Sequence, residues 1–289
     1  FKQQFALEEM QSDATILFME RAAIVSVAIG VAAGSERLGL QLRTGGERWI
    51  AAAALTGGGV GPGTDSGQRG AAARPFATHV AGLPVQAGDL VLHLGLSGAV
   101  SWQPPRRDGQ AEVALSVRPE LAVDEWNNPL GTGGLAARRA RTGGVEAGLG
   151  WRRFWSQAEA YRIEVDRAGQ RGGTLRFDGR YAQAAYTVLG VPRRWNEGAG
   201  AWGPPTPDGD GLDPSAGRWG AVELGARISE LDLSDQDVRG GRQRVWTVGG
   251  SWWPAKPLRV TLQYQHATIR GTEEDRRFQA VALRAQVYY

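Results

Sequence analysis

The strongest constraint on the fold of this chain is an alternation of apolar and polar residues with a period of two. Near the C-terminus, Val260, Leu262 and Tyr264 alternate with Thr261 and Gln263. This period places the two sets of side chains on opposite faces of a β-strand. About eleven such runs occur, with no helical apolar period between them; they lie near residues 36–43, 47–55, 74–84, 89–100, 144–151, 155–166, 181–188, 222–228, 246–252, 258–264 and 281–289. The pattern predicts an all-β fold.

Two all-β architectures account for this alternation, a soluble sandwich and a transmembrane barrel. A sandwich buries its apolar faces between two sheets and carries charges of both signs on its outer faces. A transmembrane barrel turns its apolar face to lipid and its polar face to an aqueous lumen. Here the polar face consists of Gln, Thr, Ser, Gly and Arg, and Trp or Tyr residues cluster at the strand ends. Both features favour an antiparallel transmembrane β-barrel.

The composition excludes several classes of function. The 289 residues contain no cysteine, so neither a disulfide framework nor a thiolate metal site is possible. His79, His93 and His266 share no ligand spacing and are interpreted as scattered polar residues, so neither a metal nor a cofactor is predicted. The net charge is only +3, and the arginines form no basic run with interleaved aromatics, which argues against a nucleic-acid partner.

Other absences concern catalysis and targeting. The sequence contains no Gly-x-Ser-x-Gly motif and no histidine at a useful spacing from a carboxylate, so an enzyme is not predicted. The apolar stretch 22–33 is too short, and too rich in Gly and Ala, for a transmembrane helix. The chain starts without Met and without the charged and apolar regions of a signal peptide, so we expect a fragment that lacks an N-terminal portion.

The connections between the predicted strands alternate in length along most of the chain. Short turns at 44–46, 85–88, 152–154 and 254–257 all fall at the same end of the strands. In an outer-membrane barrel the short turns lie at the periplasmic rim and the long loops lie outside. The short turns therefore predict which end of the strands is periplasmic.

Two longer connections follow from this assignment. The segment 101–143 falls at the extracellular end, and its basic cluster ARRARTGG, residues 137–144, is predicted to be a solvated loop and not an anion collector. The segment 190–217 falls at the periplasmic end although it is long. We expect the latter to fold back against the rim of the barrel.

Four spaced segments and the terminal aromatic strand resemble the phosphate-selective porin O and P family. The segments are FALEEMQSDATILFMERA (5–22), LRFDGRYAQAAYTVLG (175–190), WGAVELGARISELDL (219–233) and GGRQRVWTVGGSWWP (240–254). The resemblance implies a trimeric outer-membrane barrel of sixteen strands in a Gram-negative bacterium, with a constriction loop after the fifth strand. It also implies that residues 1–35 are this loop, that residues 36–289 are the C-terminal part of the barrel, and that five strands are missing.

The resemblance places Glu9, Ser12, Glu20 and Arg21 in the pore constriction. Arg21 matches the arginine that closes this segment, and Ser12 matches a serine within it. Glu9 stands where phosphate-selective members carry a lysine, and Ala14 replaces a second basic position. An anion that sheds water at the narrowest point must be compensated by fixed positive donors, so a carboxylate there would repel phosphate. The sequence therefore supports a channel more strongly than it supports phosphate selectivity.

Four arginines are predicted to line the pore. Arg118 matches one arginine of a turn that folds toward the pore, and Arg227, Arg259 and Arg284 fall on the polar face of predicted strands. Arginine suits phosphate because its planar guanidinium offers paired donors and stays charged. Arg227, Arg259 and Arg284 could equally stiffen the wall through hydrogen bonds with Glu223 and neighbouring glutamines. The two interpretations remain open at this point.

The predicted function is passive diffusion of small anionic or hydrophilic solutes across the outer membrane, with phosphate or polyphosphate among the candidate solutes. The expected partners are outer-membrane lipid, further copies of the chain in a homotrimer, and the barrel assembly machinery, which would recognise the strand 281–289. The apolar face of that strand would contact lipid, with its terminal tyrosines in the aromatic girdle of the periplasmic rim. The alternative is a non-conducting barrel with a structural or adhesive role.

Overall fold

A single curved antiparallel sheet dominates the structure. The computed structural model describes residues 2–32, 34, 37–59, 75–102, 104–107, 109–121, 129–169, 172–209, 211–271 and 275–288. The main path of the sheet runs through β1 (Arg37–Gly46), β2 (Trp49–Gly59), β3 (Pro75–Ala87), β4 (Leu90–Ser101), β7 (Leu130–Trp151), β8 (Phe154–Arg167), β9 (Thr174–Leu189), β12 (Ala221–Asp235), β13 (Val238–Trp253), β14 (Leu258–Arg270) and β15 (Arg276–Val287). Within the described residues this path contains eleven strands, as the sequence predicts.

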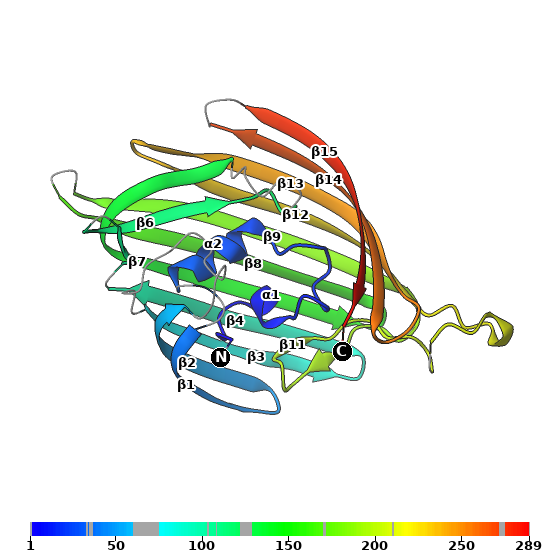
Figure 1. Cartoon of the computed structure of the whole chain (residues 1–289). Helices are drawn as coiled ribbons and strands as arrows, with labels where there is room; N and C mark the ends of the chain where they lie inside the picture. The colour runs from blue at the N-terminus through cyan, green and yellow to red at the C-terminus, as the bar shows by residue number, and fades with distance from the viewer. Residues whose placement is uncertain are drawn as a thin grey trace.

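The remaining elements are short and lie beside or inside this sheet (Figure 1). The strands β5 (Arg106–Arg107) and β6 (Gln110–Val117) join it next to β7, and β10 (Trp195–Asn196) pairs with β11 (Ala201–Trp202). The helices are α1 (Leu7–Met10), α2 (Ala23–Val31) and the 3-10 turn η1 (Pro214–Ala216). Figure 1 shows α1 and α2 on the concave side of the sheet, so the N-terminal segment lies along its inner face.

The alternation of residues sets the register of the sheet. In the β14–β15 hairpin, Thr261 pairs with Arg284 and Leu262 pairs with Leu283, so polar residues meet polar ones and apolar residues meet apolar ones. A slip of one residue would turn the apolar set toward the polar interior, which is why the period of two specifies the pairing. The hydrophobic pattern therefore acts as the registration signal for the whole path.

The two faces of the sheet differ as the sequence predicts. On β15, Val281, Leu283 and Val287 point outward and are 72, 71 and 69% exposed. On the concave face, Arg259 of β14 is 1% exposed beneath the N-terminal segment, and Gln265 is fully buried beside Pro119 of the turn after β6. This agrees with the predicted apolar outer face and with a polar inner face on this part of the sheet, whereas the inner face around residues 23–31 is apolar and includes Ile163 and Leu231. The last predicted girdle residue, Tyr289, lies outside the described residues.

The N-terminal segment contains a helix that the sequence pattern does not predict. Residues 23–31 form α2, and every residue of this helix except Ser26 is buried. The helix is apolar all round because it packs inside the curved sheet, so it lacks the one-sided period by which helices are recognised. Gly179 of β9 makes room for it, since a Cβ at that position would lie 2.7 Å from the Ile24 side chain. No helix within the described residues is long and apolar enough to cross a membrane.

The segment 101–143 is also less loop-like than the sequence suggests. Its second half belongs to β7, which begins at Leu130, so the basic cluster at 137–144 is a strand and not a solvated loop. The reason is pairing with charges on β8: Arg139 donates to Asp166 and Arg141 donates to Glu164, at 2.8 and 2.5 Å. The predicted alternation of short and long connections is also weaker than expected. The connection between β12 and β13 falls at the end where long loops were predicted, but it consists only of Gln236 and Asp237.

The long connection 190–220 folds back against the sheet in its first half, as expected. Its Trp202 is 2% exposed and packs with Leu7 of the N-terminal segment and Trp155 of β8. Bridges between Val191 and Thr206 close this part into a compact loop. The second half, which carries η1, extends away from the sheet in Figure 1. This part of the connection therefore covers the concave side of the sheet next to α1.

Candidate functional site

The candidate site is the segment 2–32, which lies across the concave face of the sheet (Figure 1). This segment includes α1, α2 and the irregular stretch 11–22 between them. Side chains from β7, β8, β12, β14 and β15 contact its main chain from the wall. The contacts fall into two groups, a pair of carboxylates at α1 and a row of arginines along the irregular stretch.

The carboxylates of Glu146 and Glu159 hold the start of α1. The Leu7 amide donates to Glu146 Oε2 at 3.0 Å and to Glu159 Oε2 at 3.2 Å, and the Glu8 amide donates to Glu159 Oε1 at 2.8 Å. The first amides of a helix have no partner within the helix, so carboxylates suit them. The two wall residues are 3 and 2% exposed and are direct neighbours across the β7–β8 pair. They attach α1 to the wall.

Neighbouring hydrogen-bond donors offset the cost of burying these two carboxylates side by side. His79 and His93 each place Nε2 at 2.8 Å from Glu146 Oε1, and both rings are fully buried. Tyr161 donates to Glu159 Oε2 at 2.7 Å, and Tyr181 donates to Glu159 Oε1 at 2.5 Å. Two like charges placed opposite each other on adjacent strands are unfavourable unless donors surround them.

Sequence reasoning missed this cluster. His79 and His93 belong to β3 and β4, and they are not scattered polar residues because both face one carboxylate, Glu146. The available signal was two inward-facing glutamates on consecutive strands, together with two inward-facing histidines. That signal becomes visible only once the register of β3, β4, β7 and β8 is known.

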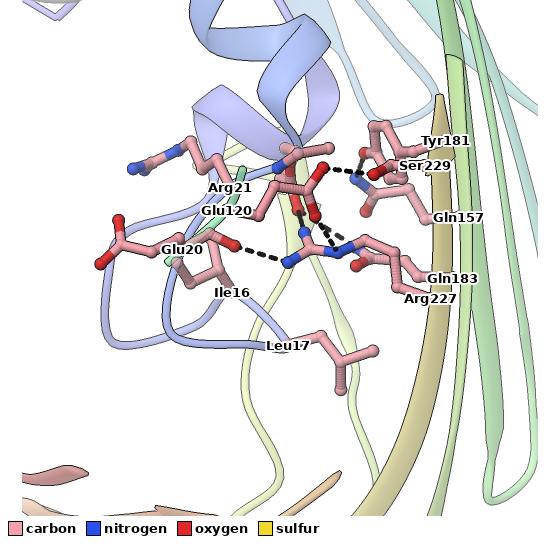
Figure 2. Close-up of polar contacts among 12 residues, drawn as sticks. Ile16, Leu17, Glu20, Arg21, Glu120, Gln157, Tyr181, Gln183, Arg227 and Ser229 are labelled. Carbon is pink, nitrogen blue, oxygen red and sulfur yellow. Dashed lines mark hydrogen bonds and ion pairs between the residues drawn. The ribbon is translucent and has the colours of Figure 1, made fainter. Parts of the chain in front are cut away.

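Arg227 of β12 is the centre of the second group of contacts (Figure 2). Its Nη1 donates to Glu8 Oε1 at 3.0 Å, its Nη2 donates to the Glu20 carbonyl at 2.7 Å, and its Nε lies 3.3 Å from Glu120 Oε2. The guanidinium also lies over the Phe18 ring, 5.0 Å from its centroid. Arg227, Glu8 and Glu120 are each less than 5% exposed, so this is a buried cluster of one cation and two carboxylates.

Glu120 reaches the cluster from the turn after β6. The turn brings Pro119 and Glu120 inward, with Glu120 in the left-handed region at φ 58°. Its carboxylate accepts from the Ala23 amide at 3.0 Å and from the Ser229 hydroxyl, and Gln265 donates to the Pro119 carbonyl. Arg118 is half-buried in the same turn. The structure thus brings the predicted arginine turn to the concave face, although Glu120 provides the contact with α2.

Arg259 and Arg284 bind carbonyl oxygens of the irregular stretch. Arg259 donates to the carbonyls of Ile16 and Leu17 at 2.8 and 2.7 Å, and Arg284 donates to the Met19 carbonyl at 2.8 Å. Arg259 also donates to Ser251 Oγ at 2.9 Å. Of the two interpretations of these wall arginines, the structure supports the hydrogen-bonded network, but its acceptors are main-chain carbonyls and not Glu223.

Arg193 is the residue that binds Glu223, and sequence reasoning missed it. Its Nε donates to Glu223 Oε1 and its Nη2 donates to Glu223 Oε2, both at 2.8 Å, and both side chains are 1% exposed. Its Nη1 donates to the Thr15 carbonyl at 2.7 Å, and the guanidinium lies 4.6 Å from the centroid of the Trp155 ring. Arg193 belongs to the connection after β9, where no strand alternation marked it as inward-facing.

Of the predicted constriction residues, Glu9 lies in α1, and Ser12, Glu20 and Arg21 lie on the irregular stretch that follows it. Glu9 lies 3.1 Å from Arg21 Nε and 3.8 Å from Lys2 Nζ, and Arg21 also contacts Asp13 at 2.7 Å. Burial raises the pKa of Glu9, and the Arg21 guanidinium partly offsets that rise. Glu9, whose carboxylate was predicted to repel anions, is thus 5% exposed and paired with Arg21 and Lys2.

Ser12 and Glu20 lie at the solvent side of the same stretch. Ser12 is exposed, and its carbonyl accepts from the Thr15 hydroxyl at 3.0 Å. The Glu20 side chain is half-buried and points away from Arg227, whereas its carbonyl points toward that residue (Figure 2). Burial raises the pKa of Glu20, and Arg284 opposes that rise. Among the described residues no group of His, Cys, Asp and Glu could hold a metal ion.

Comparison with known proteins agrees with this architecture. A curated protein of Caulobacter vibrioides, itself described as uncharacterized, is 28% identical over 295 residues, and the match covers 98% of this chain and 56% of that protein. The chain therefore spans about half the length of the curated relative it matches. The family model for phosphate-selective porin O and P matches residues 1–289. The chain belongs to the phosphate-selective porin O and P family, a family of outer-membrane β-barrel proteins of Gram-negative bacteria.

Proposed function

We propose that the protein is a passive diffusion channel for small hydrophilic solutes, anions among them, with the segment 2–32 as its constriction. The observation that carries the proposal is the attachment of this segment to the concave face. Wall arginines bind the carbonyls of Ile16, Leu17, Met19 and Glu20, and wall carboxylates bind the amides at α1. A segment fixed in this way narrows an aqueous lumen at one level, as a constriction requires.

Strong selectivity for phosphate is not part of the proposal. A phosphate site needs guanidinium donors that are free to bind the solute. Arg227, Arg259 and Arg284 already donate to the N-terminal segment, and Arg21 is paired with Glu9 and Asp13. The solvent-facing edge of the segment thus offers Arg21 and Lys2 against Asp13 and Glu20, which is a balanced set of charges. We expect weak anion preference at most.

Electrical recording of the full-length protein in planar bilayers tests this function. We expect stepwise conductance increases, a small reversal potential in a salt gradient, and no strong block of the chloride current by millimolar phosphate. Absence of conductance steps would contradict the channel. Strong phosphate block would contradict the weak selectivity and would leave the channel intact.

A non-conducting barrel is the second candidate, and α2 is the observation that favours it. This helix fills concave space with Ile24, Val25 and Ile29, which pack against inward side chains of the wall such as Ile163 and Leu231. An apolar plug of this kind suits a structural or adhesive barrel. The same bilayer recordings separate the two candidates, because a plugged barrel inserts without conductance steps.

The proposal includes the assembly of the channel. The exposed apolar row of β15 supports contact with outer-membrane lipid and recognition of this strand by the barrel assembly machinery. A homotrimer is proposed from membership of the family. Chemical crosslinking in native outer membranes tests the trimer, and a monomeric crosslinking pattern would contradict it.

Replacing Glu20 with glutamine should shift the selectivity toward anions. The substitution removes one negative charge from the constriction and leaves the bond between the Glu20 carbonyl and Arg227 in place. Because burial raises the pKa of Glu20, its carboxylate becomes neutral as the pH falls through a range above that of an ordinary glutamate. Acidification of the unmodified channel should therefore move the reversal potential in the same direction as Glu20→Gln.

The variant also provides the control for this pH effect. In Glu20→Gln channels the acid-induced shift should be smaller than in unmodified channels. Equal shifts in both proteins would assign the titration to another group.

A further inference from the structure

A groove on the outer face of the sheet lies where the apolar belt gives way to arginines. Along β9 the outward side chains are Tyr186, Ala184 and Ala182, and these are followed by Arg180 and Asp178. The same change occurs on the neighbouring strands, from Ala160 to Arg162 on β8, from Ile228 to Glu230 on β12 and from Trp246 to Arg244 on β13. The boundary is level on β9, β12 and β13, because Arg180 pairs with Glu230 and Glu230 pairs with Arg244. On β8 it lies one outward residue further along, since Ala160 pairs with Arg180 and Arg162 pairs with Asp178.

This boundary corresponds to one surface of the membrane. Aromatic side chains, Phe154 on β8 and Tyr186 on β9, mark the other end of the apolar belt, next to the short turns. From Phe154 to Arg162 the strand advances roughly 26 Å at about 3.3 Å per residue. At a tilt of about 40° this becomes roughly 20 Å, near the apolar band of about 25 Å of outer-membrane barrels. Since short turns are periplasmic, the arginines lie at the headgroups of the outer leaflet.

The groove is continuous from the arginines into the apolar belt. Its charged end has a volume of about 880 Å³, and it is lined by five arginines (Arg162, Arg180, Arg242, Arg244 and Arg270) and three carboxylates (Asp178, Glu230 and Asp232). Two adjoining depressions of about 620 and 420 Å³ extend it over Ala158, Ala182 and Ile228. One surface feature thus combines a cationic end with an apolar trough.

The charges at this end are not balanced. Arg162 is paired with Asp178 at 2.8 Å, Arg180 is paired with Glu230 at 2.8 Å, and Arg242 is paired with Asp232. Arg244 shares Glu230 with Arg180, and Arg270 has no ion pair among the described residues. The groove therefore has two more guanidinium groups than carboxylates, and its guanidinium groups are exposed on the surface.

We propose that this groove binds a phosphorylated lipid of the outer leaflet, with phosphate groups at the arginines and acyl chains along the apolar trough. The proposal rests on the outer-membrane location included in the proposed function. Guanidinium groups match phosphate with paired donors, and the excess of positive charge attracts an anionic headgroup. A lipid with two phosphates and several acyl chains, the chemistry of lipid A, fits two surplus charges better than a neutral lipid does. The charged end also distinguishes this surface from an apolar interface with a second copy of the chain.

Native mass spectrometry of the full-length protein in neutral detergent, titrated with lipid A, tests the proposal. Arg270→Gln removes the arginine that has no ion pair within the described part of the chain, so the three carboxylates that line the groove keep their partners. Ala182→Trp fills the apolar trough without a change in charge. We expect each variant to weaken lipid A binding about tenfold, which corresponds to the loss of one charge-assisted contact or of the chain-binding surface. Arg139→Gln, which changes an arginine of β7 outside the groove, is the charge control and should leave binding unchanged.

The lipid itself provides the second set of controls. Dephosphorylated lipid A and phosphatidylcholine should bind more weakly than lipid A to the unmodified protein. Equal binding of the dephosphorylated lipid, unchanged affinity in both groove variants, or occupation of the groove by a second copy in crosslinking would overturn the proposal. Conductance is also recorded for every variant and should be unchanged, because these residues lie outside the lumen. A protein that conducts normally without binding lipid A contradicts only this inference.

Discussion

Channels with Arg227→Met should show a larger and noisier conductance than the unmodified channel, together with a less stable barrel. The substitution leaves Glu8 and Glu120 buried without their cation and removes the donor to the Glu20 carbonyl. Breaking a buried ion pair by removing one partner costs about 3–5 kcal/mol. The segment 2–32 should therefore lose its fixed position. Single-channel recording measures the noise, and urea titration of the barrel in detergent measures the free energy of unfolding.

Two further variants make the Arg227 prediction specific. Arg284→Met removes a single donor to the Met19 carbonyl and leaves no buried carboxylate unpaired, so its effect should be much smaller. Combining Arg227→Met with Glu8→Gln and Glu120→Gln should restore part of the stability, because the unpaired charges are gone. If Arg284→Met destabilised the protein as much as Arg227→Met, the buried charges would not be the cause.

Arg193→Met should also destabilise the protein strongly, although Arg193 lies in the connection between β9 and β12 and not in a strand. The substitution leaves Glu223 buried without a cation and releases the Thr15 carbonyl. We expect a loss of about 3–5 kcal/mol in the free energy of unfolding. We also expect faster proteolysis of the segment 2–32, because Arg193 joins it to the connection. Limited proteolysis of the refolded protein measures the second effect.

The neighbouring residue offers a matched control for Arg193. Arg194 is exposed, so Arg194→Met changes the same net charge without breaking a buried pair. Its stability and proteolysis should match the unmodified protein. A double variant, Arg193→Met with Glu223→Gln, should recover part of the stability. Equal losses in the Arg193 and Arg194 variants would show that net charge, and not the buried pair, controls the effect.

The period of two made the main path of the sheet predictable from sequence, including its eleven strands and the direction of the side chains on the last five of them. Arg259 and Gln263 were assigned to the inner face from alternation alone, and both are buried there. Such assignments succeed because one face of each strand meets an apolar environment and the other a polar one. The same reasoning failed for α2, which is apolar all round, and for Arg139 and Arg141, whose charges are accommodated by partners on β8.

The site was predictable in its location but not in its contacts. Resemblance to the family indicated the segment that contains Glu9 and Arg21, but the pairing of these two residues depends on the path of an irregular stretch. The partners of Glu8, namely Arg227 and the Gln183 side chain, are 219 and 175 residues away in sequence. Contacts of this range follow from barrel geometry and leave no local pattern. Arg193 was missed for the same reason.

The acceptors on the irregular stretch have a consequence for how the pore can change. Arg193, Arg227, Arg259 and Arg284 bind the carbonyl oxygens of residues 14–20, and every amino acid carries a carbonyl. These bonds hold the main chain of the stretch and do not depend on its exposed side chains, whereas Ile16, Leu17 and Phe18 are buried against the wall. Substitutions at the solvent-facing positions of this stretch, natural or engineered, can therefore alter which solutes pass while the arginines that bind its main chain stay the same.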